Sequence, residues 1–151
     1  TITNNVKHEI VKKAASNPKF YGKLSEMLEE IIEQRRIEAI SYEEYLKRVV
    51  ELAKLVLHPE NSGGYPDLVK DREAKRALFD YFDGDAAKAV NMHNAIKVSL
   101  KTNWKENQQK KNSLKLAIFN NLSLYSSDED ENSRKVEEIF EIVERQEEYD
   151  M

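Results

Sequence analysis

Glycine and proline, the two strongest helix breakers, are scarce in this chain of 151 residues, and their scarcity is what most constrains its fold. The sequence has four glycines and three prolines. In a helix interior glycine costs about 1 kcal/mol and proline about 3 kcal/mol relative to alanine. A chain that largely lacks both and is rich in lysine, glutamate, leucine and alanine favours helices. Because 40% of the residues are hydrophobic, a single domain of this length can bury a core.

The composition also excludes several classes of protein. The chain has no cysteine, so it has no disulfide, thiolate nucleophile, Cys-bound zinc or iron–sulfur cluster. No apolar run is long enough to span a membrane, and the polar start of the chain does not look like a signal peptide. We therefore expect a cytoplasmic protein with no membrane contact. A formal net charge of −4 argues against a nucleic-acid coat protein but allows a local basic surface.

Apolar residues recur at intervals of three and four along most of the chain, which is the period of an amphipathic helix. Several helix starts are marked by capping residues: Asn17 before Pro18, the capping box of Ser41 and Glu44, and Asp85. No stretch alternates apolar and polar residues long enough for a strand. The sequence thus predicts an all-α bundle of six or seven helices, over residues 6–16, 18–39, 42–57, 72–82, 86–100, 104–122 and around 136–143.

Residues 59–70 (PENSGGYPDLVK) interrupt the helical pattern. They hold two of the three prolines and two of the four glycines, a composition typical of a linker or a loop. We interpret them as a joint between an N-terminal helical subdomain, 1–58, and a C-terminal one, 71–151; an ordinary surface loop is the alternative. A second polar stretch, 123–133, is acidic and predicts a mobile loop inside the C-terminal part.

No combination of residues predicts catalysis. The Gly22-Lys23 pair lacks the upstream glycine of a phosphate-binding loop and lies inside a helical pattern. The histidines His8, His58 and His93 share no metal-binding spacing, so we expect His93 to be packed on a helix face and not to be a ligand. Most acidic residues have a lysine or arginine three or four positions away, as on a solvated helix face. We expect no catalytic residue, metal site or cofactor.

The segment from Lys97 to Lys115 is basic in an otherwise acidic chain. If a helix starts at Trp104, Asn107 and Lys111 share its apolar stripe. Two interpretations stay open for these residues. They lie at the rim of the core with the lysine stem packed, or they form a contact surface for phosphates or an acidic protein, anchored by Trp104. The segment holds one acid, Glu106, and six lysines, at 97, 101, 105, 110, 111 and 115.

The same region carries a resemblance to a known family. Tyr65-Pro66, then residues 74–80 (AKRALFD), then residues 104–111 (WKENQQKK) resemble the C-terminal helical domain of type I restriction enzyme R subunits. That family has a Tyr-Pro, an Ala-x-Arg-Ala-Leu-aromatic-Asp helix and a Trp-Arg-x-Asn-x-x-Lys helix start, in this order. Lys105 stands where the family more often has arginine. Shorter segments upstream extend the resemblance to about residues 25–145, namely 33–36 (EQRR), 41–45 (SYEEY) and 52–54 (LAK).

The resemblance implies that this chain is one part of a larger, ATP-dependent DNA-translocating nuclease. ATP and Mg²⁺ would be bound by other domains of that parent, so the chain itself is expected to be neither an enzyme nor a cofactor-binding protein. In the family this domain is associated with docking onto the methyltransferase core, which is built from modification and specificity subunits. For the contact we expect Tyr65, Arg76, Trp104, Lys105, Asn107 and Lys111. For Arg76 a surface ion pair with Asp80 or Asp83 is the structural alternative.

Two other functions remain open on the residues alone. The lysines of 97–115 could contact the phosphate backbone of duplex DNA, a mode of binding that is steeply salt-dependent and indifferent to sequence. Alternatively the bundle is purely structural and stiffens or caps the motor domains of the parent. Full burial of Trp104, Asn107 and Lys111 would favour that structural role.

Overall fold

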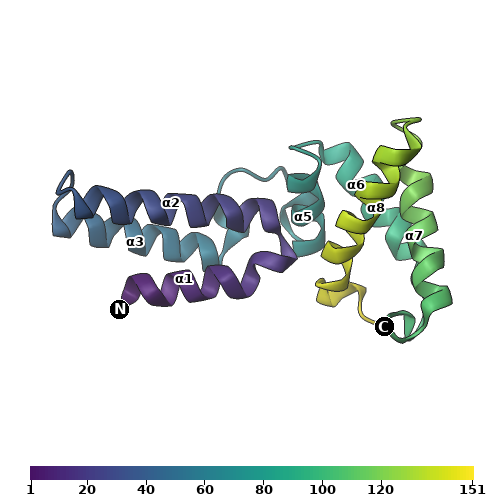
Figure 1. The fold of residues 1–151 in the computed structure, drawn as a ribbon, viewed down its shortest axis with the longest axis horizontal. Helices are drawn as coiled ribbons and strands as arrows, with labels where there is room; N and C mark the ends of the chain where they lie inside the picture. Colours follow the sequence, from purple (N-terminus) through teal and green to yellow (C-terminus); the bar gives the residue numbers. More distant parts are fainter. The chain divides into compact units, whose positions relative to one another are not determined.

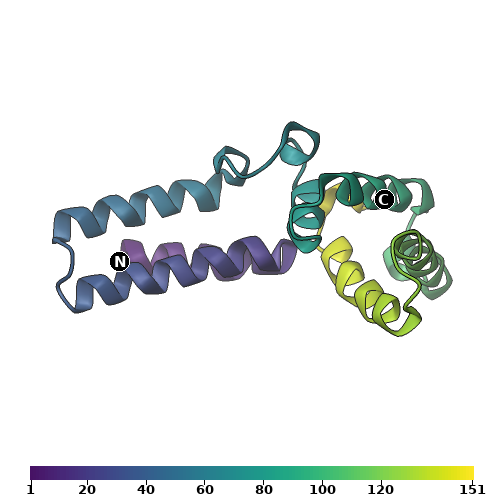
Figure 2. The same cartoon turned by 90° about the horizontal axis from the view of Figure 1, so that it is seen from above.

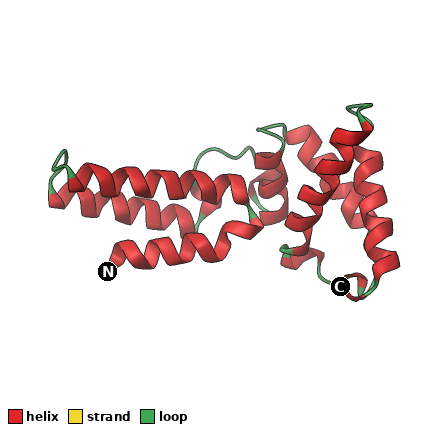
Figure 3. Cartoon of the chain, viewed as in Figure 1, coloured by secondary structure: helices red, strands yellow, loops and turns green.

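The computed structural model describes every residue from Thr1 to Met151 and contains helices but no β-strand (Figure 3). The predicted all-α class is therefore confirmed. The chain divides into two compact units, which we call unit 1 (Thr1–Tyr65) and unit 2 (Pro66–Met151). There are eight α-helices where six or seven were expected, because a single helical turn, α4 (Asp67–Lys70), lies in the segment interpreted as a joint.

Unit 1 is a bundle of three helices in which each helix packs against the other two (Figures 1 and 2). A 3-10 turn (Ala14–Ser16) links the first two helices, and another (Pro59–Asn61) follows the third. The helices are α1 (Ile2–Lys13), α2 (Pro18–Arg36) and α3 (Tyr42–Leu57). The shared interior is apolar and consists of Val6, Ile10, Tyr21, Leu24, Leu28, Ile31, Val49, Leu52 and Val56.

Both predicted caps in unit 1 form. The Asn17 side chain accepts a hydrogen bond from the Phe20 amide at 3.2 Å, and the Ser41 hydroxyl accepts one from the Glu44 amide at 3.0 Å. The helix expected to reach residue 39 ends at Arg36, because Glu38 takes a left-handed conformation with φ of 58°. The amides of residues 38 and 39 then bond back to the carbonyls of residues 35 and 34, which closes the last turn.

Unit 2 contains the other five α-helices. In chain order α5, α6, α7 and α8 each pack on the next, and α8 also contacts α5. Two 3-10 turns complete the unit, η3 (Trp104–Glu106) and η4 (Glu147–Tyr149). After the short α4, the helices are α5 (Glu73–Tyr81), α6 (Ala86–Ser99), α7 (Gln108–Leu122) and α8 (Glu129–Glu144).

Two boundaries in unit 2 differ from the sequence expectations. The helix expected to start at Trp104 starts at Gln108, because the Asn107 side chain accepts a hydrogen bond from the Lys110 amide at 3.1 Å and caps it there. The acidic loop expected over 123–133 is shorter, since α8 begins at Glu129. Asp128 caps α8 by accepting from the Glu131 amide at 3.1 Å, and acidic side chains in a first turn complement the helix dipole.

No helix of either unit combines the length and the apolar character that crossing a bilayer would require.

Candidate functional site

Trp104 lies at the centre of unit 2 and not on its surface. Its side chain is 1% exposed, and its ring meets Phe140 edge to face with centroids 5.9 Å apart. The indole Nε1 donates a hydrogen bond of 2.8 Å to the backbone carbonyl of Tyr149. A partner that docks on the folded chain therefore does not touch this ring, so Trp104 is no exposed anchor.

The last residues of the chain are held against unit 2 by contacts to several elements. Besides the bond from Trp104 to Tyr149, the carboxylate of Glu148 accepts from the Ala74 amide at 3.3 Å and lies 3.5 Å from Arg72 Nη1. The ammonium of Lys105 pairs with Asp150 and donates to the backbone carbonyl of residue 144 at 2.9 Å. The amide of residue 103 bonds to the carbonyl of residue 151 at 3.2 Å. These contacts order a segment that has no long helix of its own.

A buried pair of polar aromatic side chains completes this arrangement. His93 of α6 is 5% exposed, and Tyr149 is 1% exposed. His93 Nδ1 and the Tyr149 hydroxyl are 2.6 Å apart, and Glu148 lies 4.0 Å from His93 Nε2. Burial lowers the pKa of His93 against the opposing effect of Glu148, and burial raises the pKa of Tyr149. At neutral pH the imidazole of His93 and the hydroxyl of Tyr149 are thus both uncharged, as expected for polar side chains packed in a core.

Half of the lysines in the basic segment are used within the chain. Lys105 is bound as described above, Lys110 donates to the backbone carbonyl of residue 102, and Lys115 pairs with Glu137 at 3.1 Å. Lys105 Nζ also lies 5.6 Å from the centre of the Trp104 ring, a cation–π geometry. These three side chains stabilise unit 2 and are less available to a partner than the sequence suggests.

The other three lysines have no intramolecular partner. Lys97 and Lys101 are exposed, and Lys111 is half-buried. Lys97 is in the last turn of α6, where a positive charge complements the helix dipole. Of the residues at 104–111 expected to contact a partner, Asn107 is exposed but occupied as a cap. Among them Lys111 is therefore the charged side chain most available to a partner. A purely structural role would be favoured by full burial of Trp104, Asn107 and Lys111, but only Trp104 is fully buried.

Tyr65 and Arg76 belong to other segments of the chain than 104–111. Tyr65 is the last residue of unit 1, and its ring lies 5.9 Å from that of Phe20. Arg76 is on α5 and donates a 2.6 Å hydrogen bond to the Lys70 carbonyl, which ties α4 to α5. Contact with a partner stays a prediction for the five residues other than Trp104, and of these only Lys105, Asn107 and Lys111 lie on one continuous segment.

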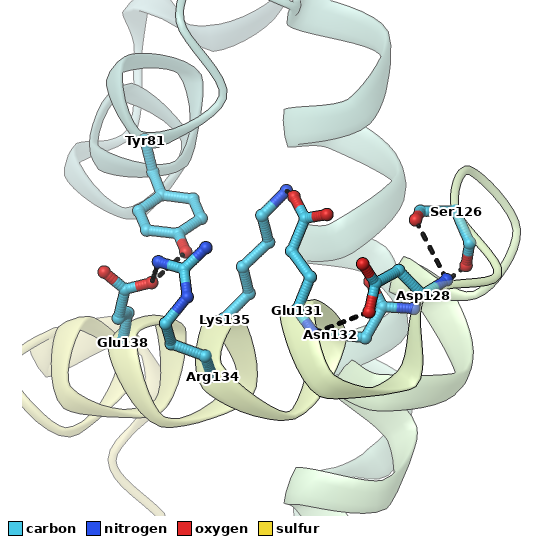
Figure 4. A network of polar contacts seen from close by, with 8 residues as sticks. All are labelled: Tyr81, Ser126, Asp128, Glu131, Asn132, Arg134, Lys135 and Glu138. Atoms are coloured by element: carbon cyan, nitrogen blue, oxygen red, sulfur yellow. Dashed lines mark hydrogen bonds and ion pairs between the residues drawn. The ribbon is translucent and has the colours of Figure 1, made fainter.

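Polar side chains along α8 form an ordered network that includes the buried Asn132 (Figure 4). Glu138 accepts from the Tyr81 hydroxyl at 3.0 Å and pairs with Arg134 at 3.2 Å. One turn earlier Lys135 pairs with Glu131 at 2.8 Å. The side-chain nitrogen of Asn132 donates a hydrogen bond to the Ser126 backbone carbonyl at 2.9 Å. This network fixes the start of α8 and links the helix to α5.

Sequence reasoning missed the role of Tyr149 and Glu148. Both follow the last helical stretch in a polar run, where no apolar periodicity marks a core position. The one available signal was an isolated aromatic residue among acidic neighbours. The interaction that buries it comes from Trp104, a residue 45 positions away in the chain.

The comparisons with known proteins return no relative. No protein-family model, no curated protein and no solved structure matches the chain. The structure also shows no group of three or more histidine and acidic side chains arranged to hold a metal ion. The likeness to type I restriction R subunits therefore depends on the sequence motifs alone.

Proposed function

We propose that this chain is a non-catalytic helical docking module that holds the motor subunit of a type I restriction enzyme on its methyltransferase core. The motifs at 65–66, 74–80 and 104–111 suggest this role. The observation that supports it best concerns the basic segment, residues 97–115. The buried Trp104 fixes this segment in place, yet Lys97, Lys101 and Lys111 have no partner within the chain.

Unpaired ammonium groups on an ordered scaffold suit recognition of an acidic protein surface. Complementary charge speeds encounter and sets orientation. Because η3 is packed through Trp104, its neighbours Lys101 and Lys111 start from a fixed backbone, and less conformational entropy is lost on binding. In this proposal Trp104 supports the surface from beneath and does not itself contact the partner.

The remaining functions of the complex would belong to other domains of the parent. ATP and Mg²⁺ would be bound there, and the modification and specificity subunits would form the docking partner. Such a complex acts on DNA inside the cell, which would place this chain in the cytoplasm.

The test is binding of the purified full chain to an immobilised methyltransferase core at low and moderate salt. Replacing the three free lysines (Lys97→Gln, Lys101→Gln, Lys111→Gln) should weaken binding about tenfold, as expected for loss of several interfacial charges. The matched control neutralises three exposed lysines of unit 1: Lys12→Gln, Lys23→Gln and Lys47→Gln. Equal binding by the two triple variants would defeat the proposal.

The same three lysines favour a second candidate function, contact with the phosphate backbone of DNA. Such contacts release counterions, so affinity should fall steeply with salt and depend little on sequence. A gel shift with two duplexes of unrelated sequence separates the candidates. A shift at low salt that disappears at moderate salt, and that the triple variant lacks, supports DNA contact; absence of a shift at low salt removes it.

A further inference from the structure

The outer face of the α2–α3 pair in unit 1 carries an open groove of about 280 Å³. One wall is formed by four α2 residues at intervals of three and four: Met27, Glu30, Ile31 and Gln34. The facing wall repeats that spacing on α3, with Arg48, Glu51, Leu52 and Leu55. In an α-helix this spacing selects a single face, so one stripe of each helix faces the groove.

The first helix of the bundle does not cover this groove. α1 meets the α2–α3 pair elsewhere, where Lys13 Nζ donates to the Val56 carbonyl at 3.2 Å and Lys7 lies 4.0 Å from Glu29. No residue of α1 lines the groove. A pair of antiparallel helices with one side covered and the other open has the geometry into which a further helix packs to complete a four-helix bundle.

The floor of the groove is apolar and partly accessible. Ile31 and Leu52 belong to the core of unit 1, and Leu55 packs beside them. Met27 is 44% exposed, although its position on the stripe is equivalent to that of the buried residues. Methionine is flexible and adapts its shape to different apolar partners. The floor thus offers apolar surface that a helix can bury.

The charge along the rim determines which helix fits. The charge of Arg48 is compensated within the chain by Glu44 at 3.0 Å, and its guanidinium also donates a hydrogen bond to the Gln34 side-chain oxygen at 2.6 Å. Glu30 accepts only a long hydrogen bond from Gln34, at 3.4 Å, and Glu51 has no partner. The uncompensated charge is therefore negative on both walls. A second copy of this face would bring carboxylates against carboxylates.

We propose that this groove binds an amphipathic helix of a partner protein whose apolar stripe is flanked by lysine or arginine. The apolar stripe would lie on Met27, Leu55 and the exposed edge of Ile31, while Leu52 supports them from within the core. The basic flanks would reach Glu30 on one side and Glu51 on the other. This inference concerns unit 1 and does not rest on the function proposed for the lysines of unit 2.

The experiment titrates the full ¹⁵N-labelled chain with a synthetic helix and follows amide chemical shifts. The probe is a peptide of about 18 residues, long enough to form a helix, with leucine at heptad positions a and d and lysine at e and g. Shift changes should be confined to residues 27–34 and 48–55. A second peptide with glutamate in place of lysine should bind more weakly.

Matched variants test the charge requirement. Glu30→Gln with Glu51→Gln should weaken binding of the lysine peptide about fivefold, the size expected for two exposed ion pairs. Glu106→Gln with Glu141→Gln removes two exposed charges from unit 2 and should leave binding unchanged. The proposal is overturned if neither peptide binds, if both bind equally, or if the shifts lie outside the groove. Concentration-dependent shifts at 27–34 without peptide would overturn it too, because they would assign the groove to a second copy.

Discussion

The two units of this protein have interiors of different chemistry. In unit 1 the core is a set of apolar side chains on three helices, and the one buried polar residue, Asn17, is a helix cap. Unit 2 also buries apolar side chains, but His93, Asn132 and Gln146 are buried among them. There the indole of Trp104 both buries apolar surface and donates a hydrogen bond to the Tyr149 carbonyl.

This difference reflects what each core has to hold. Unit 1 packs regular helices, whose backbone groups are satisfied internally, so apolar contact is sufficient. Unit 2 must also hold an irregular segment, 145–151, whose position no helix period sets. Directional bonds to Tyr149 and Glu148 do this. A buried polar contact of this kind specifies position, but it is costly when one partner is removed.

The largest expected effect is that of Trp104→Ala, which tests how much unit 2 depends on its buried tryptophan. Losing a fully buried tryptophan should lower the free energy of unfolding of unit 2 by about 3–5 kcal/mol. Residue-resolved hydrogen exchange should show the loss in α8 and in 145–151, with circular dichroism in urea giving its size. Trp104→Phe leaves the Tyr149 carbonyl without its donor. Because it keeps a ring beside Phe140, it should still cost less stability than Trp104→Ala. A change below about 1 kcal/mol for the alanine variant would contradict a core role.

Tyr149→Phe removes only a hydroxyl and should cost about 1–3 kcal/mol, because it leaves His93 Nδ1 buried without its partner. Urea denaturation measures the loss, and the ring signals of His93 should shift. Tyr125→Phe is the matched control. Its hydroxyl accepts from Asn91 at 2.6 Å but lies at an exposed position, where changes stay within about 0.5 kcal/mol. Equal costs for the two variants would show that the buried bond has no special weight.

The helix caps should behave alike in the two units, which sharpens the contrast between their cores. Asn107→Ala in unit 2 and Ser41→Ala in unit 1 should each cost about 1 kcal/mol of helix stability. Thermal and urea unfolding give both values. If Asn107→Ala is neutral, its side chain is not needed as a cap, and a role in contacting a partner gains weight.

The smallest expected effect is a pH dependence from His93. Burial lowers its pKa below the ordinary value of 6.5, and Lys75, Lys97 and Arg72 act in the same direction while Glu148 opposes. Below pH 6.5 the unfolded chain therefore takes up a proton that the folded chain does not. Stability from this group is present above that pH and is lost as the pH falls through the folded pKa.

Urea unfolding at a series of pH values measures this dependence. His93→Gln should reduce the loss of stability on acidification, whereas the same change at the exposed His8 should leave that loss as large as in the unsubstituted protein. A pH profile unaffected by His93→Gln would show that the folded and unfolded chains bind protons at this site equally.

The sequence predicts unit 1 more fully than unit 2. Asn17, Ser41 and the apolar spacing place α2 and α3 to within a few residues, because each signal is local. In unit 2 the same reasoning fails at Trp104. A helical period through 104, 107 and 111 exists, but Asn107 caps α7 and leaves Trp104 in a separate turn. It also misplaces the first turn of α8, where an acidic run looks like a loop until Asp128 is recognised as its cap.

For the candidate site the prediction is partial. The basic character of 97–115 is visible in the sequence, but which of its lysines are free is not. Lys105 and Lys115 are bound by residues from α8 and the end of the chain. Only the packing of α7 and η3 against α8 and the end of the chain shows that Lys97, Lys101 and Lys111 have no ion-pair or hydrogen-bond partner.

The amino-acid sequence by itself determined the helical class, most helix limits and the absence of thiol chemistry, because breakers, caps and periodicity act over a few neighbouring residues. Tertiary structure alone decided that Trp104 is internal, that Tyr149 and His93 meet, and that one side of the α2–α3 pair stays open. Those outcomes depend on contacts between residues 45 or more positions apart, or on which of several possible helix faces a neighbour covers, and no local pattern specifies either.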